Sequence, residues 1–224
     1  VYQIVENAPE PLGSTMKDLI ERRLADPTLP MEEAFLQQLK EKDLELPAGQ
    51  FALFMNSMYA VDAYVRDYFR KAALDALLAE KLPVTVFGEG WEKYSYRDER
   101  SLRREPAVPF ALSFERIAKA HVLLNVSPIF NRGMHDRVPA GMANHAVVLT
   151  DENPYLRRTF TDGEELLFYS LVKPDTLCEK AKRALSDAGL REKIAASAYE
   201  TFEREYTWKR RAEHILAFAE EVEA

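Results

Sequence analysis

The sequence has one cysteine, four histidines and no long apolar segment, and each of these scarcities excludes a class of protein. The single cysteine, Cys178, cannot form a disulfide within the chain, which indicates a reducing compartment, and we expect a cytoplasmic protein. The histidines do not lie at the spacing of metal ligands and no Cys-x-x-Cys pair accompanies them, so we predict no metal site. No apolar run approaches the roughly 18 residues of a membrane span, so none is predicted.

The sequence also has fewer basic than acidic residues. The 30 Lys and Arg residues are outnumbered by 37 Asp and Glu, which gives a formal net charge of -7 at pH 7. Proteins whose main partner is nucleic acid usually carry the opposite sign, so we expect no nucleic acid partner. Residues 1–10 lack the basic and apolar stretches of a signal peptide. The chain begins with Val rather than Met, and we expect it to be part of a longer protein.

Two regions of the chain differ in their hydrophobic periodicity. Up to residue 82, apolar side chains recur at helical spacing, which predicts a helix that ends at 26–27, another at 30–46 and one long helix at 50–81. After Pro83, short apolar runs alternate with helical segments, the pattern of βα units. We therefore predict an α/β fold at 83–224, with a mostly parallel sheet flanked by helices, preceded at 1–82 by a helical region that packs on it.

The predicted elements of the second region follow from this alternation. We expect strands at Val84–Phe87, Phe110–Leu112, His121–Val126, Ala146–Thr150 and Leu166–Tyr169. We expect helices from Ser113, around 138–143, at 175–186, at 189–204, and from Thr207 to the end of the chain. The charged stretch 92–105 has no apolar period and is predicted to be a solvated loop.

The most informative segment is the polar loop that follows the strand at 121–126. It holds two guanidinium groups, an imidazole, a carboxylate and a glycine within residues 132–137. The next predicted strand ends in Asp151 and Glu152. The carboxyl ends of neighbouring parallel strands meet at one edge of a sheet, where open α/β folds bind ligands. Guanidinium groups suit phosphate oxygens, so the loop favours an anionic ligand such as a nucleotide diphosphate.

Several short segments resemble, in order and spacing, the C-terminal half of two-domain glycosyltransferases of the B fold. They are Val86–Trp91, Leu124–Pro128, Gly133–Val138, Ala146–Asp151, Asp162–Glu165 with Phe168-Tyr169, and Thr207-Trp208 with Arg211. Together they cover about residues 83–215 and look closest to the spore-maturation-type group of the family-1-like glycosyltransferases. The resemblance implies a Rossmann-like domain that binds a nucleotide-diphosphate sugar and needs no further cofactor. The acceptor, whether carbohydrate, lipid or protein, is not identified, and most of the acceptor domain is expected outside this chain.

The same resemblance suggests roles for individual residues. We predict that His135 and Arg137 stabilise the departing diphosphate. Further contacts with the donor are predicted for Gly88, Glu89, Gly90, Trp91, Asn125, Arg132, Gly133, Asp136, Asp151 and Glu152. Structural roles remain open for several of them: an Asp136–Arg137 ion pair, a carboxylate cap before Pro154, or packing of the tryptophan against the sheet.

The sequence departs from the family pattern at three places. Many relatives carry a glutamate after the Arg-Val pair, where it holds ribose hydroxyls, and this sequence has Pro139-Ala140 instead. Asn144-His145 replaces a small glycine, and Tyr206 replaces a histidine. Two functions therefore stay open: a sugar-transferring enzyme, or a non-catalytic nucleotide- or protein-binding module that retains the fold. A sugar-phosphate isomerase or epimerase ranks last, because the glycine-rich dinucleotide fingerprint is missing.

Overall fold

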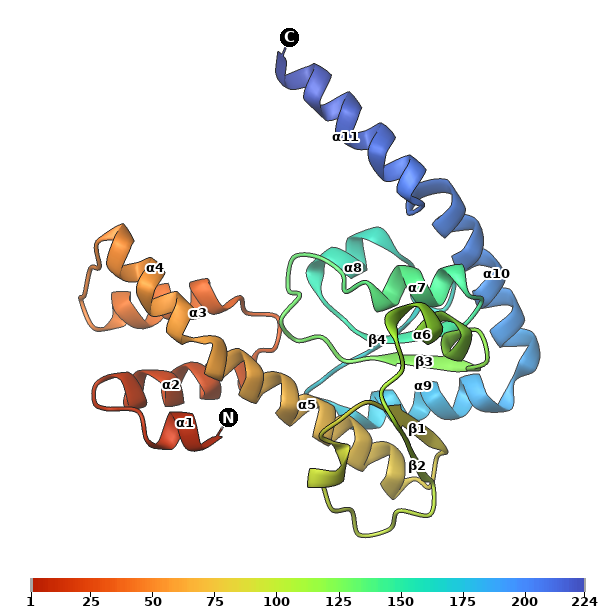
Figure 1. The fold of residues 1–224 in the computed structure, drawn as a ribbon, viewed down its shortest axis with the longest axis horizontal. Coiled ribbons are helices and arrows are strands. Elements are labelled where there is room, and N and C mark those ends of the chain that lie inside the picture. Colours follow the sequence, from red (N-terminus) through yellow and green to blue (C-terminus); the bar gives the residue numbers. More distant parts are fainter. Residues whose placement is uncertain (1, 224) are drawn as a thin grey trace.

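The computed structural model describes residues 2–223, in which a helical part is followed by an α/β part (Figure 1). The helical part consists of α1 (Tyr2–Glu6), α2 (Leu12–Ala25), α3 (Met31–Glu41), α4 (Ala48–Ser57) and α5 (Tyr59–Ala79). The α/β part consists of β1 (Val84–Phe87), the 3-10 helix η1 (Trp91–Lys93), β2 (Leu102–Glu105), α6 (Phe110–Ile117), β3 (Val122–Asn125), α7 (Arg137–Ala143), β4 (Val147–Asp151), α8 (Pro154–Thr159), β5 (Leu167–Tyr169), α9 (Pro174–Ser186), α10 (Ala188–Glu205) and α11 (Trp208–Glu223).

Every strand pair in the described chain is parallel. Strand β1 pairs with β2, and β3, β4 and β5 form a second sheet in that order. The predicted α/β class with a parallel sheet is confirmed, with the difference that the strands form two sheets. In the second sheet Asn125 is in register with Thr150, and Asp151 with Tyr169. Polar residues at the carboxyl ends of the three strands therefore meet at one edge.

The three-stranded sheet is covered by helices on both faces, as Figure 1 shows. Successive side chains of a strand point to opposite faces. Accordingly, Val147 and Leu149 of β4 belong to a core shared with α5 and α9, and Val148 belongs to a second core shared with α7, α8 and α10. All five residues of β4 are buried. A fully buried strand explains why this segment is an unbroken apolar run in the sequence.

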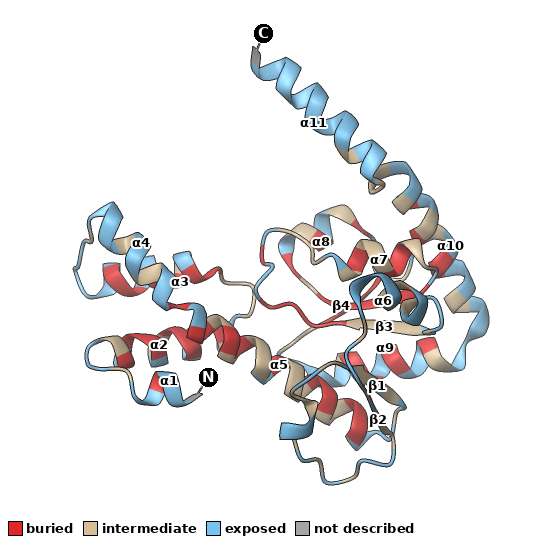
Figure 2. Ribbon diagram, in the orientation of Figure 1, coloured by how far each residue is buried: buried red, intermediate tan, exposed pale blue. Residues whose placement is uncertain are grey.

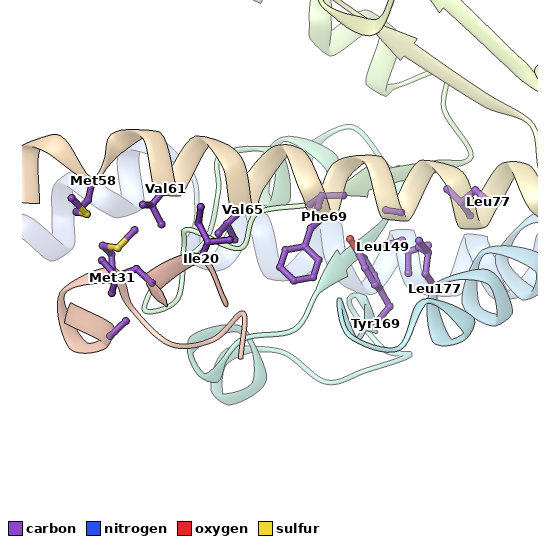
Figure 3. Close-up of a cluster of buried hydrophobic side chains, with 14 of the residues drawn as sticks. Ile20, Met31, Met58, Val61, Val65, Phe69, Leu77, Leu149, Tyr169 and Leu177 are labelled. Atoms are coloured by element: carbon purple, nitrogen blue, oxygen red, sulfur yellow. The ribbon is translucent and has the colours of Figure 1, made fainter. Parts of the chain in front are cut away.

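Helix α5 connects the helical part to the sheet through one continuous core (Figure 3). Near its start, Val61 and Val65 pack with Ile20 of α2, and further along Phe69 lies over Leu149 of β4. These positions recur every fourth residue, so they form one apolar face of the helix. Burial of that face fixes the rotation of α5 about its axis.

The predicted single helix at 50–81 is wrong, because the chain bends at Met58. This residue ends α4 and precedes α5 with φ -76° and ψ -2°. Helix α4 places Phe54 against Phe35 of α3, with ring centroids 4.3 Å apart and nearly parallel planes. The preceding Ser57 donates to Leu53 O, a competing hydrogen bond that weakens a helix locally.

Two further predictions in the α/β part are wrong. The stretch 92–105 is not all loop, because Leu102–Glu105 forms β2 and pairs with β1. Backbone hydrogen bonds hold this exposed edge strand, so its sequence shows no apolar alternation. Phe110–Leu112 is not a strand but the first turn of α6, which follows Pro109. Phe110 is 71% exposed and contacts Phe114 one turn later instead of joining the sheet.

Helix α11 projects from the α/β part, and most of its described side chains are exposed (Figure 2). Trp208, at its first turn, is 91% exposed. Among the described helices, none is long and apolar enough to cross a membrane.

Substituting Gly141 by alanine is expected to lower the free energy of unfolding by about 1–3 kcal/mol, the range of overpacking. A Cβ at Gly141 would overlap Val148 Cγ2 and lie 3.0 Å from Leu123 Cδ2, so α7 would have to move away from the sheet. Gly49→Ala is the matched control, since a Cβ there meets nothing within 4 Å. Urea denaturation measures both variants, and an unchanged midpoint for Gly141→Ala would show that α7 does not pack this closely.

Candidate functional site

The carboxyl edge of β3, β4 and β5 is held together by buried polar side chains. The amide of Asn125 donates to Thr150 Oγ1 at 2.9 Å, and the hydroxyl of Tyr169 donates to the Asn125 carbonyl at 2.9 Å. The backbone N–H of Ser127 donates to Asp151 Oδ1 at 2.7 Å. Buried polar groups require such partners. The network therefore sets the direction in which the loop after β3 leaves the sheet.

Arg137, the first residue of α7, lies against this network. Its Nη1 donates to Asn125 Oδ1 at 2.5 Å, and its Nη2 lies 3.1 Å from His135 Nε2. A guanidinium group can only donate, so Nε2 accepts in this contact, while Nδ1 lies beside the carboxylate of Asp136 and 3.2 Å from the backbone nitrogen of Arg137. Two N–H groups of Arg137 are used in these contacts with Asn125 and His135.

The charge state of His135 follows from its surroundings. Burial lowers the pKa of His135, and the positive charges of Arg137 and Arg70 lower it further, against the opposing carboxylate of Asp136. The ring is therefore neutral at pH 7 and accepts from Arg137 instead of repelling it. Phe130 packs edge-on against the ring, with centroids 5.1 Å apart. We interpret His135 as a residue that positions Arg137.

The loop 127–133 is anchored on two sides by buried side chains. Arg23 of α2 donates to Pro128 O at 3.2 Å, so the helical part contacts the loop directly. Asn153 donates to Phe130 O at 2.7 Å from the start of α8. Because both anchors are side chains bonded to loop carbonyls, the loop conformation depends on the helical part as well as on the sheet.

A cavity of about 280 Å³ lies between the helical part and this loop. Its lining includes Arg23, Glu32, Asp62, Phe130, Arg132 and Gly133. The Gly133 turn thus faces a concave surface, whereas Arg137 does not line it. A larger hollow of about 630 Å³ lies at the opposite end of the sheet, beside His121, His145 and Tyr199. These histidines directly precede β3 and β4, so that hollow is remote from the carboxyl edge.

The structure brings some of the predicted residues together and separates others. Asn125, His135, Asp136, Arg137 and Asp151 belong to one network at the sheet edge. The others have different neighbours. Arg132 is 72% exposed and pairs with Glu33, and Glu152 pairs with Arg157.

The carboxylates after β4 do not cap helix α8. Its cap is Asn153, whose Oδ1 accepts from Leu156 N at 2.8 Å, so the alternative of a cap by Asp151 or Glu152 is wrong. Asp151 is only 3% exposed. Burial raises its pKa to about 6, although the N–H of Ser127 and the charge of Arg137 act in the opposite direction. Through this hydrogen bond with Ser127, Asp151 holds the loop after β3.

The glycine pair after β1 forms a tight turn. Gly88 and Gly90 have φ values of 109° and 91°, in the region that favours glycine. Trp91 Nε1 donates to the Phe87 carbonyl at 3.3 Å, which folds the indole back toward its own strand. Glu89 is exposed at the tip. This turn belongs to the β1–β2 sheet and makes no hydrogen bond with Arg137.

One arginine that was not among the predicted site residues acts on this network. The charge of Arg70 of α5 lowers the pKa of both His135 and Arg137. Arg66 lies one turn earlier on α5 and lowers the pKa of Arg70, after burial as the first cause. In the sequence, Arg66 and Arg70 are indicated only by their i, i+4 spacing beside an apolar stripe, a pattern that is common on helix surfaces. In residues 2–223, no cluster of His, Cys, Asp and Glu is arranged to hold a metal ion.

Comparison with known proteins agrees with the geometry. Residues 66–217 match the family model described as glycosyl transferase-like. The structure is similar to the crystal structure of TarM, with a TM-score of 0.51 and 13% sequence identity. That likeness covers 67% of this chain and 31% of TarM, and at this identity it concerns the fold alone. No protein with a curated description matches the sequence.

Proposed function

The chain belongs to the glycosyl transferase-like family, and on this basis we propose that it is the donor-binding part of a B-fold glycosyltransferase of the spore-maturation type. Its substrate is a nucleotide-diphosphate sugar. The observation that carries the proposal is the partly buried guanidinium of Arg137, held at the carboxyl edge of a parallel sheet by Asn125 and His135, with no ion pair to a carboxylate among the residues described. This edge is where open α/β sheets bind their ligands.

The chemistry of sugar transfer requires a positive group at this place. When the bond between the sugar and the diphosphate breaks, negative charge develops on the departing phosphate oxygen. A preorganised guanidinium group stabilises that charge without having to reorient, because it is already held in position. Arg137 contacts the diphosphate in this proposal, and His135 keeps its guanidinium in place. The residue that removes the proton from the acceptor hydroxyl is proposed to lie outside the network described.

One observation favours the second candidate, a non-catalytic module that has kept the fold. Helix α7 carries no carboxylate, and Pro139 and Ala140 stand where relatives hold ribose. Loss of the ribose contact is expected in a protein that no longer uses the nucleotide-sugar donor. Binding of a nucleotide diphosphate separates the enzyme from a protein-binding module that has lost the donor site, and sugar transfer separates it from a module that only binds nucleotide.

We expect saturable binding of UDP or GDP by the chain, with a Kd below about 1 mM, which corresponds to about 4 kcal/mol. Isothermal titration calorimetry measures it, and uridine and guanosine serve as controls that lack phosphate. The nucleosides should bind at least tenfold more weakly, because the guanidinium of Arg137 has no partner in them. If neither diphosphate shows saturable binding at millimolar concentration, the donor site has been lost and the module is the better description.

A further inference from the structure

The cavity of about 280 Å³ between the helical part and the loop after β3 has a polar wall that is fixed by hydrogen bonds. Arg23 of α2 lines it and is only 1% exposed. Its Nη1 donates to the carboxylate of Asp62 on α5, and its Nη2 donates to Pro128 O at 3.2 Å. Asn131, also in the lining, donates to the same carbonyl at 3.0 Å. The polar wall is therefore held in position by contacts within the protein, which lowers the cost of ordering it around a ligand.

The protein does not satisfy this buried guanidinium completely. Arg23 Nε is buried and has no hydrogen-bond partner among the residues described. An unpaired buried donor costs stability, so a group of this kind is retained where it serves another purpose. Its place in the wall of a cavity makes binding of a ligand that purpose.

Another part of the lining is apolar. It is formed by Pro30, Met31, Ile129 and Phe130. Met31 is buried in the core of the helical part together with Met58, as Figure 3 shows, whereas Ile129 and Phe130 are 37% and 38% exposed. The cavity therefore offers an aromatic surface beside hydrogen-bonding groups, the combination found in sites for small molecules.

The charges of the lining balance one another. The guanidinium groups of Arg23 and Arg132 and the carboxylates of Glu32 and Asp62 all line the cavity. A bound anion would lie near two carboxylates, and a bound cation would lie near two guanidinium groups, so neither is favoured. A carboxylate only accepts hydrogen bonds and a guanidinium group only donates them, whereas a hydroxyl group does both. The lining therefore suits a neutral ligand that carries several hydroxyl groups.

The size of the cavity limits this ligand to one ring. Sites for drug-sized molecules occupy about 300–1,000 Å³, and this cavity lies just below that range. A sugar ring meets the requirements of the lining, because hydroxyl groups surround its edge and its C–H groups form an apolar face. A whole nucleotide is too large for the cavity.

We propose that this cavity binds a single sugar ring, whose hydroxyl groups donate to Glu32 and Asp62 and whose apolar face packs against Phe130. This inference rests on the proposed function, and it gives the helical part of the chain a role in recognising the sugar. The ring has two possible sources: the sugar of the nucleotide-sugar donor, or a sugar unit of a carbohydrate acceptor. Gly133 lines the cavity and belongs to the loop that leads to Arg137, so either source lies beside the proposed donor site.

NMR titration of the chain tests the assignment, because it measures weak as well as tight binding. The probes are UDP-glucose, UDP-N-acetylglucosamine and GDP-mannose, the methyl glycosides of the same three sugars, and UDP and GDP as references without a hexose. Glu32→Ala is expected to weaken binding of the sugar-carrying probes by about tenfold, the loss of one charge-assisted hydrogen bond. Its affinity for UDP and GDP should stay within twofold of the unmodified chain.

Two further variants complete the experiment. Glu21→Ala is the matched control: this residue is exposed on α2 and is not in the lining, so no affinity should change by more than twofold. Asp62→Asn keeps an oxygen that can accept from Arg23 and removes the charge, so it should weaken the same probes as Glu32→Ala does. Glu32 is exposed in the first turn of α3, so its variant should fold like the unmodified chain, and thermal unfolding checks this.

The probes identify the source of the sugar and separate this inference from the function on which it rests. A loss confined to the nucleotide sugars assigns the cavity to the donor, and a loss confined to the methyl glycosides assigns it to an acceptor. Binding of glycosides without binding of UDP or GDP keeps the sugar site and removes the proposed donor site. If UDP or GDP binds and both cavity variants bind every sugar probe as well as the unmodified chain, the inference is overturned and the donor site stands. Equal losses for UDP and UDP-glucose would show displacement of the loop and also overturn it. If no probe binds, the inference and the proposed function both fail.

Discussion

Replacing Arg137 with glutamine is expected to weaken binding of a nucleotide diphosphate by about 100-fold, the largest change in affinity that the structure predicts. The guanidinium is partly buried at the sheet edge and is held in place by Asn125 and His135. Its removal costs two charge-assisted hydrogen bonds, each taken at about 1.5 kcal/mol, the low end of the usual range. Isothermal titration calorimetry with UDP and GDP provides the measurement, and loss of saturable binding is the expected result if the unmodified chain binds in the millimolar range.

A second arginine in the same loop provides the matched control for this experiment. Arg132 is exposed and paired with Glu33, so Arg132→Gln should reduce affinity by less than threefold. The variant loses the same charge without touching the network around Asn125. Equal losses for both variants would point to general electrostatic attraction instead of a defined contact. Unchanged affinity in the Arg137→Gln variant would remove the main support for a donor site at this edge.

Asp151→Asn is expected to raise the free energy of unfolding by up to about 3 kcal/mol above pH 7. Burial raises the pKa of this carboxyl from 3.8 to about 6, and each unit of that shift corresponds to about 1.4 kcal/mol. An asparagine Oδ1 can still accept from the N–H of Ser127, so the loop keeps its anchor. The native protein takes up a proton more readily than the unfolded chain, so the ionised carboxylate destabilises it at high pH.

The expected gain in stability of the Asp151→Asn variant depends on pH. The advantage of the asparagine variant should be full above pH 7, decrease as the pH falls through 6, and nearly vanish near pH 4. Urea denaturation at several pH values measures it. Asp162→Asn is the control of opposite sign: burial would raise the pKa of Asp162, but Lys180 and the N–H of Phe168 lower it overall. That variant should lose stability above pH 4. A destabilised Asp151→Asn at pH 8 would show that the charge itself is needed for folding.

The sheet and the location of its binding edge were predictable from local sequence patterns. Strand β4 is an unbroken apolar run between helical segments, and a strand covered on both faces has that composition. Parallel strands place their carboxyl ends side by side, so Asn125, Asp151 and the loop holding Arg137 had to converge. In contrast, β2 was not predicted. It is held by backbone pairing with β1, and such pairing does not require a periodic pattern of apolar side chains.

The state of the individual groups at that edge was not predictable in the same way. Asp151 follows a strand and suggested a ligand contact or a cap, yet it is buried against the N–H of Ser127. His135 suggested a donor to phosphate, but its burial between Phe130 and Arg137 keeps the ring neutral. Both outcomes depend on which neighbours exclude water, and those neighbours come from distant parts of the chain.

The amino-acid sequence by itself determined the α/β class, the parallel order and the cationic loop after β3, because periodicity and loop composition act over short stretches of chain. Only the tertiary structure decided that Arg23 of α2 reaches the carbonyl of Pro128 in that loop. Packing of Val65 and Phe69 in the shared core joins the helical part to the sheet. Residues that far apart in the chain meet only once the core has formed.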